Sequence, residues 1–200
     1  AVGKFAFEIG ELDGVVRPRL ETVKEILSAA GGTTILTNLM GIRWTKLLMN
    51  STFSGMSAAL GCSFRDLLAD EKAMTCIAHI ADETIKVCHG KGYRMVEMQG
   101  ADMESLELRS KADIAGKMDL YRKVWGRHNN KASMLQDLEK GNNTEIDYIN
   151  GVVCRSGREC NIATPFNDKV VEIVKQAEAQ RTVTDFGNLA RFDEIIAQAK

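Results

Sequence analysis

Apolar and polar positions alternate at the start of the chain and then follow a helical period over most of its length. Every second residue of 5–9 is apolar, which is the two-residue period of a half-buried strand. Apolar residues recur at helical spacing over 20–30, before a pair of glycines, and 33–37 is short and β-branched. Residues 1–38 therefore predict a strand, a helix and a second strand, with 15–19 either an edge strand or a loop.

The remainder of the chain predicts helices. The longest apolar pattern starts at Asn38 or Gly41 and runs to Leu60, and it covers nearly the whole circumference of a helix, as in a helix buried among others. Further helices are expected at 70–90, at 133–141, from 146 to about 160, and from Pro165 onward. Residues 101–125 predict one solvent-facing helix or a pair of them. The predicted fold class is mainly α: an all-helical domain at 39–200 behind a fragment of an α/β domain at 1–38, which has too little sheet to stand alone.

Composition limits the possible partners of the chain. Its 26 basic and 27 acidic residues leave a net charge of -1, so we expect neither nucleic acid nor a membrane surface as a partner. No apolar run is long enough to span a bilayer, and no signal peptide is recognisable. The five cysteines are odd in number and widely spaced, which favours reduced thiols in a cytoplasmic protein.

One polar row interrupts the long apolar helix. Lys46, Asn50 and Ser54 follow at intervals of four, which places them on one face. A lysine on a buried helix is costly unless it is paired or opens into a cleft, and burial would lower its pKa toward that of a proton donor near neutral pH. Two interpretations stay open: a tuned lysine with an amide and a hydroxyl that hold a small polar substrate, or a lysine and two polar groups satisfied within the packing.

Helix starts provide the second group of candidates. Ser133 and Glu145 each lie at a predicted helix N-terminus, where unpaired N–H groups favour anions and polar ligands. Capping is the simpler interpretation, because three predicted starts carry a capping pattern. The pairs are Ser63 with Asp66, Ser133 with Gln136, and Thr144 with Asp147. The Cys and His residues at 76, 79, 88 and 89 fall on one predicted helix without a C-x-x-C pair, so we expect no metal site.

Four parts of the sequence carry a specific set of motifs. In chain order they are F-x-x-G-E-x-x-G in residues 5–14, W-x-K-L-x-x-N at 44–50, the pair S-M-x-x-D and T-E-I-D-x-x-N-G within 131–137 and 144–151, and P-x-N within 162–167. In these motifs the chain resembles the ketopantoate reductases (2-dehydropantoate 2-reductases) from about residue 3 to residue 178. Any one motif alone would be weak, but their order and spacing are specific.

The resemblance implies an NADPH-dependent oxidoreductase of pantothenate biosynthesis that reduces a 2-keto acid to a 2-hydroxy acid. It implies an N-terminal Rossmann domain and an all-helical C-terminal domain like that of 6-phosphogluconate dehydrogenase. The chain has no glycine-rich phosphate loop, so residues 1–38 would be the last part of the Rossmann domain. We therefore expect NADPH to be bound mainly by a domain that this chain lacks, and the 200 residues alone to be inactive.

The resemblance also implies roles for the candidate residues. Lys46 would be the general acid that protonates the alkoxide formed by hydride transfer, while Asn50 and Ser133 would hydrogen-bond the substrate. Glu145 would lie in the cleft between the domains, bonded to the ribose or to the hydroxyl end of the substrate. The family pattern has a second asparagine where this chain has Ser54, and the shorter side chain leaves more room, which puts ketopantoate itself in question as the substrate.

Two other functions remain open on the sequence. One is a related 2-hydroxyacid dehydrogenase that acts on another substrate. The other is a non-catalytic helical module for dimerisation or interaction, which would be favoured by a Lys46 ammonium on the open surface with no cleft near Ser133 and Glu145. The long apolar helix could also form the interface of a homodimer.

Overall fold

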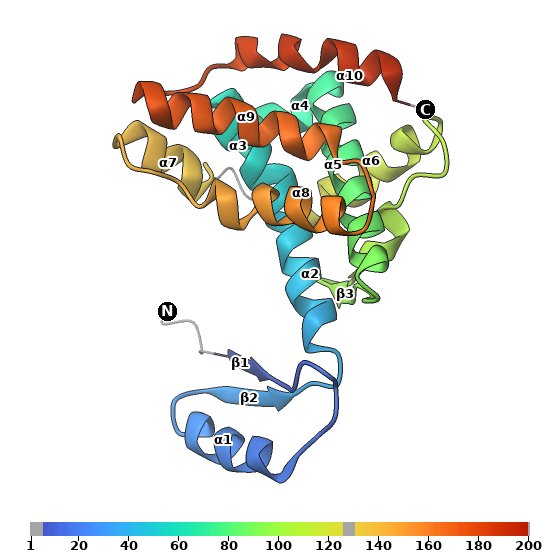
Figure 1. Ribbon diagram of the computed structural model, residues 1–200, viewed down its shortest axis with the longest axis vertical. Coiled ribbons are helices and arrows are strands. Elements are labelled where there is room, and N and C mark those ends of the chain that lie inside the picture. The colour runs from blue at the N-terminus through green and yellow to red at the C-terminus, as the bar shows by residue number, and fades with distance from the viewer. Residues whose placement is uncertain (1–5, 126–130, 200) are drawn as a thin grey trace.

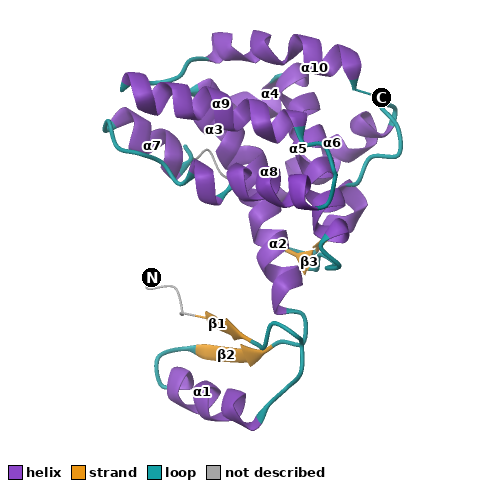
Figure 2. Cartoon of the chain, viewed as in Figure 1, coloured by secondary structure: helices purple, strands orange, loops and turns teal. Residues whose placement is uncertain are grey.

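The computed structural model describes residues 6–125 and 131–199. It consists of a small α/β unit at the N-terminal end and a larger helical part, and helix α2 (Leu39–Met49) leads from one into the other (Figures 1 and 2). The predicted fold class is confirmed, because helices make up most of the described chain and only short strands accompany them.

The N-terminal unit is a single β-α-β arrangement. Strands β1 (Ala6–Ile9) and β2 (Gly32–Ile35) pair in parallel, from Ala6 opposite Gly32 to Ile9 opposite Ile35. Parallel neighbours need a crossover, which helix α1 (Pro18–Ser28) supplies, with its proline at the first helical position. Residues 15–17 form no strand. A unit of two strands buries little surface by itself, and large apolar side chains stay exposed on it. These are Leu12, Val15, Val16, Val23 and Ile26.

The centre of the helical part is formed by two long helical runs. The first consists of α2, the π-helix η1 (Asn50–Ser54) and α3 (Gly55–Leu60), of which α3 is entirely buried. The second is α5 (Glu71–Gly90), which starts at Asp70, where the side chain accepts a hydrogen bond from Ala73 N at 2.8 Å, as predicted. Both runs contribute large, fully buried side chains to one core. They include Leu48, Phe53, Met56, Leu60, Met74, Ile77, Ile80 and Ile85.

Shorter helices cover this centre. Helices α8 (Asn150–Glu159) and α9 (Pro165–Gln180) pack against α5 and against each other, and α7 (Ser133–Glu139) packs against α3 and η1. Helix α10 (Asp193–Gln198) follows the 3-10 helix η4 (Phe186–Phe192) at the far end from the α/β unit (Figure 1). Helix α4 (Phe64–Ala69) begins with the predicted capping box of Ser63 and Asp66.

The prediction of one solvent-facing helix or a pair over residues 101–125 is wrong for the first half, which holds no α-helix. That stretch holds strand β4 (Ala101–Asp102), which pairs with β3 (Glu97–Met98), and the 3-10 helix η2 (Met103–Leu106), and α6 runs only over Asp113–Trp125. The reason is tertiary: Met103 and Leu106 are buried in the core, and Leu108 N donates to the buried Asp82 carboxylate at 2.9 Å. These contacts outweigh a weak helical pattern.

Two properties of the described residues bear on the earlier expectations. None of their helices is both long and apolar enough to cross a bilayer. The five cysteines are free, and Cys160 is half-buried while the other four are buried. Burial raises the pKa of those four thiols, Cys62, Cys76, Cys88 and Cys154, to about 12.

Candidate active site

Lys46 lies on the open face of α2 and not in the interior. Its side chain is 58% exposed, and Nζ lies 2.8 Å from Oε2 of Glu8 on β1. The prediction of a desolvated lysine is therefore wrong. The neighbouring buried positions Trp44, Thr45 and Leu48 show that α2 is buried on one side only, whereas the sequence pattern predicted burial nearly all round.

The other two residues of the row continue along the same helical run. Asn50 is exposed and Ser54 is half-buried. In a regular α-helix, steps of four residues drift by about 40° around the axis each time, because four residues exceed one turn of 3.6. Between Asn50 and Ser54 the run is a π-helix, whose wider turn winds less per residue. This lower winding opposes the drift, so helix geometry favours Ser54 on the same side of the run as Lys46 and Asn50.

Ser133 is the first residue of α7 and is exposed. Its predicted capping role is wrong: Ala132 occupies the cap position without a side-chain hydrogen bond, and Gln136 Nε2 donates to Lys131 O instead. Ala132 N donates to the buried Ser57 hydroxyl on α3 at 3.3 Å. This contact and the packing of α7 on η1 bring the Ser133 end of α7 to the helical run that carries the row.

Glu145 directly precedes the 3-10 helix η3 (Ile146–Tyr148) and is exposed. Thr144 caps this helix, because its Oγ1 accepts a hydrogen bond from Ile146 N at 3.1 Å. The backbone N–H and the hydroxyl of Thr144 both donate to Glu178 Oε1. Helix α8 follows η3 at once, and its first residue, Asn150, lies against η1. The turn that bears Glu145 is thus joined to the same region as Ser133 and Ser54.

The candidate side chains are available to a ligand but do not bind one another. Within the described residues, Asn50, Ser54, Ser133 and Glu145 make no side-chain hydrogen bond, and Lys46 has only Glu8. The segments that carry Ser133 and Glu145 thus contact the helical run of α2, η1 and α3 through Ala132 and Asn150. The structure does not enclose the candidate residues in a closed pocket.

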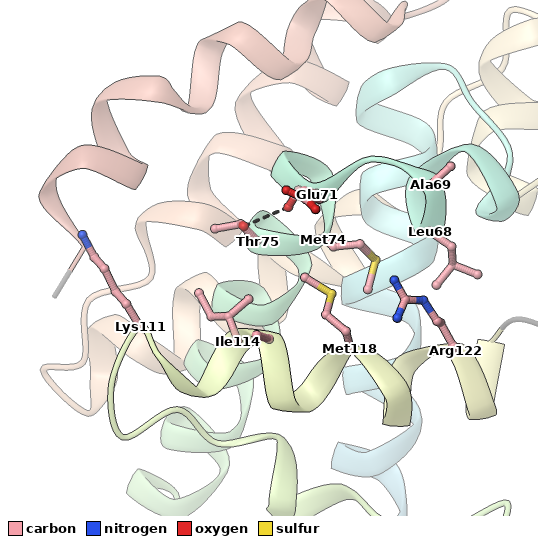
Figure 3. Close-up of a pocket in the computed structure, with 10 residues that line it drawn as sticks. Leu68, Ala69, Glu71, Met74, Thr75, Lys111, Ile114, Met118 and Arg122 are labelled. Atoms are coloured by element: carbon pink, nitrogen blue, oxygen red, sulfur yellow. Dashed lines mark hydrogen bonds between the residues drawn. The ribbon is translucent and has the colours of Figure 1, made fainter.

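Four cavities lined by described residues include none of the five candidates. One of about 290 Å³ lies beside the row, between α2 (Arg43, Leu47) and the η3–α8 segment (Tyr148, Val152). Another, of about 520 Å³, lies between α4–α5 and α6, where Met74, Met118 and Arg122 point into it (Figure 3). Neither cavity is lined by Lys46.

A buried polar chain next to the row was not predicted. Glu83, in the middle of α5, is 6% exposed and accepts hydrogen bonds from Phe166 N and Asn167 N at 2.9 Å and from Asn167 Nδ2 at 2.7 Å. Burial raises the pKa of Glu83 to about 8, against the opposing effect of these three donors. The sequence did hold a signal, since a carboxylate inside a long apolar helix needs partners.

The Cys and His residues of α5 have ordinary structural partners. The His79 ring stacks on Phe166 with centroids 4.5 Å apart, and His89 Nε2 lies 2.5 Å from Glu104 Oε2. No group of three His, Cys, Asp or Glu side chains suited to a metal ion occurs among residues 6–125 and 131–199.

The turn between β1 and α1 does not fit the phosphates of a dinucleotide. This turn would be the natural place for them, at a helix N-terminus. There the guanidinium of Arg19 is paired with Glu11 at 2.5 Å, and that of Arg17 with Asp13 at 2.6 Å. Arg17 holds the pKa of Asp13 well below its usual range. A phosphate would meet two carboxylates at this turn.

Comparison with known proteins identifies relatives for most of the chain. Residues 38–178 match the family described as "Ketopantoate reductase PanE/ApbA C terminal". The 2-dehydropantoate 2-reductase of Archaeoglobus fulgidus is 28% identical over 172 residues, which are 86% of this chain and 52% of that protein. The enzyme of the same name from Lactococcus lactis is also 28% identical, over 84% of this chain and 51% of its own length. The chain spans about half the length of these relatives.

Solved structures of similar fold include reductases and dehydrogenases. The ketopantoate reductase of Ralstonia eutropha JMP134 superposes with a TM-score of 0.68 at 21% identity, over 90% of this chain and 53% of that one, which supports the fold alone. D-mandelate dehydrogenase in complex with NADH superposes with the same TM-score at 26% identity, over 88% of this chain and 55% of that one.

Proposed function

This chain belongs to the ketopantoate reductase family, and from that premise we propose that it is the substrate-binding part of a nicotinamide-dependent reductase of 2-keto acids. The observation that carries the proposal is the family match over residues 38–178, which includes Lys46, Ser133 and Glu145. The exposed ammonium of Lys46 is what a non-catalytic module would also have, so the proposal rests on the family match and not on a desolvated lysine.

In the proposed reaction Lys46 supplies a proton. Reduction of a keto group converts its oxygen to an alkoxide, which must be protonated to give the hydroxy acid, and a positioned general acid contributes about 10²–10⁴-fold to such a step. An ammonium has three N–H groups. Lys46 can therefore keep its contact with Glu8 and also donate to a ligand oxygen above the open face of α2.

The remaining candidates are proposed to hold the substrate. Asn50 and Ser54 extend the row from Lys46 and have free hydrogen-bonding groups within the described part of the chain. Ser133 would donate to a polar group of the substrate from the start of α7. Glu145, as an acceptor at the turn before α8, would bind a hydroxyl group of the substrate or of the cofactor ribose.

We propose NADPH as the cofactor, bound mainly outside these 200 residues. Two facts support binding outside these residues: the chain covers only 52% of the Archaeoglobus fulgidus relative, and two carboxylates occupy the turn between β1 and α1. Residues 1–38 would then be the closing part of the dinucleotide-binding domain and 39–200 the helical domain. A homodimer remains a prediction, and the ketopantoate reductase of Staphylococcus aureus, 15% identical, is described as dimeric.

A second candidate substrate class is suggested by Ser54. This residue stands where the family pattern has asparagine, and a solved structure at 26% identity is a D-mandelate dehydrogenase. A shorter side chain at this position leaves room for a bulkier keto acid. Measuring kcat/KM for ketopantoate and for phenylglyoxylate, the keto acid of mandelate, separates the two, and the larger value identifies the class.

The proposed role of Lys46 is tested in the complete protein, with NADPH and ketopantoate. Lys46→Ala should lower kcat by about 10²–10⁴-fold. Lys169→Ala on α9 is the matched control, because it also removes a lysine from a surface ion pair, here with Glu172, and should leave turnover unchanged. Turnover within a few-fold of the wild type in Lys46→Ala would remove Lys46 from the mechanism.

A further inference from the structure

A chain of buried amides connects three helices to the π-helix that carries the candidate row. Asn150, the first residue of α8, is fully buried, and its Nδ2 donates to two acceptors, Ser51 O on η1 and Asn167 Oδ1 on α9, each at 2.9 Å. Asn167 in turn donates to Glu83 on α5 at 2.7 Å. Helices α5, α8 and α9 are therefore linked to η1 through one set of hydrogen bonds.

The acceptor on η1 is a carbonyl that regular helix geometry would pair differently. In an α-helix Gly55 N would donate to Ser51 O, four residues back. Here it donates to Asn50 O, five residues back as in a π-helix, and to Thr52 O. A buried carbonyl without a donor costs about 1–3 kcal/mol. Asn150 Nδ2 supplies that donor, so the side chain satisfies a group that the π-helix leaves without its α-helical partner.

Close packing fixes the position of the Asn150 side chain. A Cβ atom placed on Gly55 would lie 2.6 Å from Asn150 Oδ1, so a larger residue at that position would displace the Asn150 amide. Asn150 Oδ1 is buried and accepts no hydrogen bond within the described residues. The reversed amide would place oxygen against Ser51 O and Asn167 Oδ1, two acceptors, so the orientation with Nδ2 toward them is the favourable one.

We propose that Asn150 is a positioning residue: by holding η1 as a π-helix, it keeps Ser54 in line with Lys46 and Asn50. The proposal rests on the proposed function for its consequence in turnover, but its structural part can be tested without any activity. An α-helical rearrangement of this turn would rotate Ser54 away from the row, and a misplacement of about 1 Å in a binding site can cost about 10²-fold in rate.

The structural part is tested by hydrogen exchange in the complete protein. Asn150→Ala should speed amide exchange in the 51–55 segment relative to the wild type. The control is Thr184→Val, which also removes a buried hydrogen bond from a side chain to a carbonyl of the same helical run, Thr184 Oγ1 to Ala58 O at 2.6 Å. Unchanged exchange at 51–55 in Asn150→Ala, or an equal increase there in Thr184→Val, would overturn the proposal.

The functional part is tested by separating KM from kcat with NADPH and the better keto acid. Loss of folded protein alone lowers the apparent kcat and leaves KM unchanged, whereas a misplaced Ser54 raises KM. We expect Asn150→Ala to raise KM at least about 10-fold and to lower kcat/KM by about 10²-fold. A KM equal to that of Thr184→Val overturns the positioning role, while normal turnover in Lys46→Ala overturns the proposed function instead.

Gly55→Ala provides a second variant should Asn150→Ala fold poorly. Alanine favours helices over glycine by about 1 kcal/mol, so this change in a helix is ordinarily stabilising. Here the new Cβ would push the Asn150 amide away from Ser51 O, and we expect the same rise in KM and in exchange. Gly116→Ala on α6, where a Cβ would meet nothing within 4 Å, is the control and should change neither. A Gly55→Ala protein with wild-type KM and exchange contradicts the proposal.

Discussion

The Lys46 ammonium lies 2.8 Å from the Glu8 carboxylate, although 38 positions separate the two residues in the sequence. Glu8 belongs to the α/β unit and Lys46 to the helical part, so this ion pair joins the two. Both side chains are partly exposed, 58% for Lys46 and 38% for Glu8, and such pairs contribute little to stability.

Glu8→Gln should therefore change the free energy of unfolding by less than about 1 kcal/mol. Because salt screens exposed charges, the difference from the wild type should shrink further in about 1 M NaCl. Urea denaturation at low and high salt measures both effects. A loss of several kcal/mol that persists in high salt would show that the pair is more than a surface contact.

The buried Glu83 carboxyl should make stability depend on pH. Its pKa rises from 4.5 to about 8 on folding, so between these values the folded chain retains a proton that the unfolded chain has lost. The free energy of unfolding should therefore fall by a few kcal/mol as the pH rises from 4.5 to 8, because each pH unit within this window lowers it by about 1.4 kcal/mol.

Urea midpoints at intervals between about pH 5 and pH 8 test this, with Glu83→Gln as the variant. Its curve should be flatter than that of the wild type, although the variant is less stable overall because an amide cannot accept all three N–H bonds. Glu21→Gln, at an exposed carboxyl on α1, should keep the wild-type slope. Parallel curves for the wild type and Glu83→Gln would refute the assignment.

Gly61 ends α3 in the left-handed region, at φ 61°, and a Cβ there would lie 2.0 Å from the Thr184 carbonyl oxygen. Gly61→Ala should destabilise the protein by several kcal/mol, since it adds a backbone clash to the left-handed penalty of about 1–2 kcal/mol. Gly141 also has a positive φ, of 72°, but nothing lies within 4 Å of its Cβ position. Gly141→Ala therefore measures the left-handed penalty without a clash. Equal shifts in the urea midpoint of the two variants would mean that the chain at Thr184 moves aside at little cost.

Alanine variants of Ser63 and Ser133 should differ in effect, because Ser63 caps a helix and Ser133 is proposed to bind the substrate. Ser63 Oγ accepts from Asp66 N at the start of α4, so Ser63→Ala should cost about 1 kcal/mol without changing KM. Ser133 makes no cap bond, so Ser133→Ala should leave stability unchanged and raise KM for the keto acid about 3- to 10-fold, the value of one hydrogen bond. Denaturation and steady-state kinetics on both variants check this, and the reverse result would exchange the two roles.

Local signals in the sequence predicted much of the fold. The two-residue alternation before residue 10 identified β1, Asp70 identified the start of α5, and Pro165 that of α9. Each depends on a few adjacent residues, whose backbone preferences act without help from the rest of the molecule. The motifs at 44–50 and 144–151 indicated the family, because they depend only on residue type and spacing along the chain.

Other features depended on contacts between distant residues. The pattern on α2 predicted burial all round, but it records only that apolar residues are frequent, and Lys46 is exposed because no element of the described chain covers that face. The π-helix was not predicted either, because the donor to Ser51 O comes from Asn150, 99 positions away. Glu83 likewise depends on the N-terminus of α9 for its partners.

The sequence by itself thus determined where most helices begin and end and to which family the chain belongs, because these follow from local propensities and motif spacing. Only the tertiary structure decided that Lys46 faces outward toward Glu8, that η1 is a π-helix and that Asn150 holds it. All three depend on contacts between residues far apart in the sequence, and the hydrogen bonds of Asn150 are favourable because burial has removed water as the competing partner.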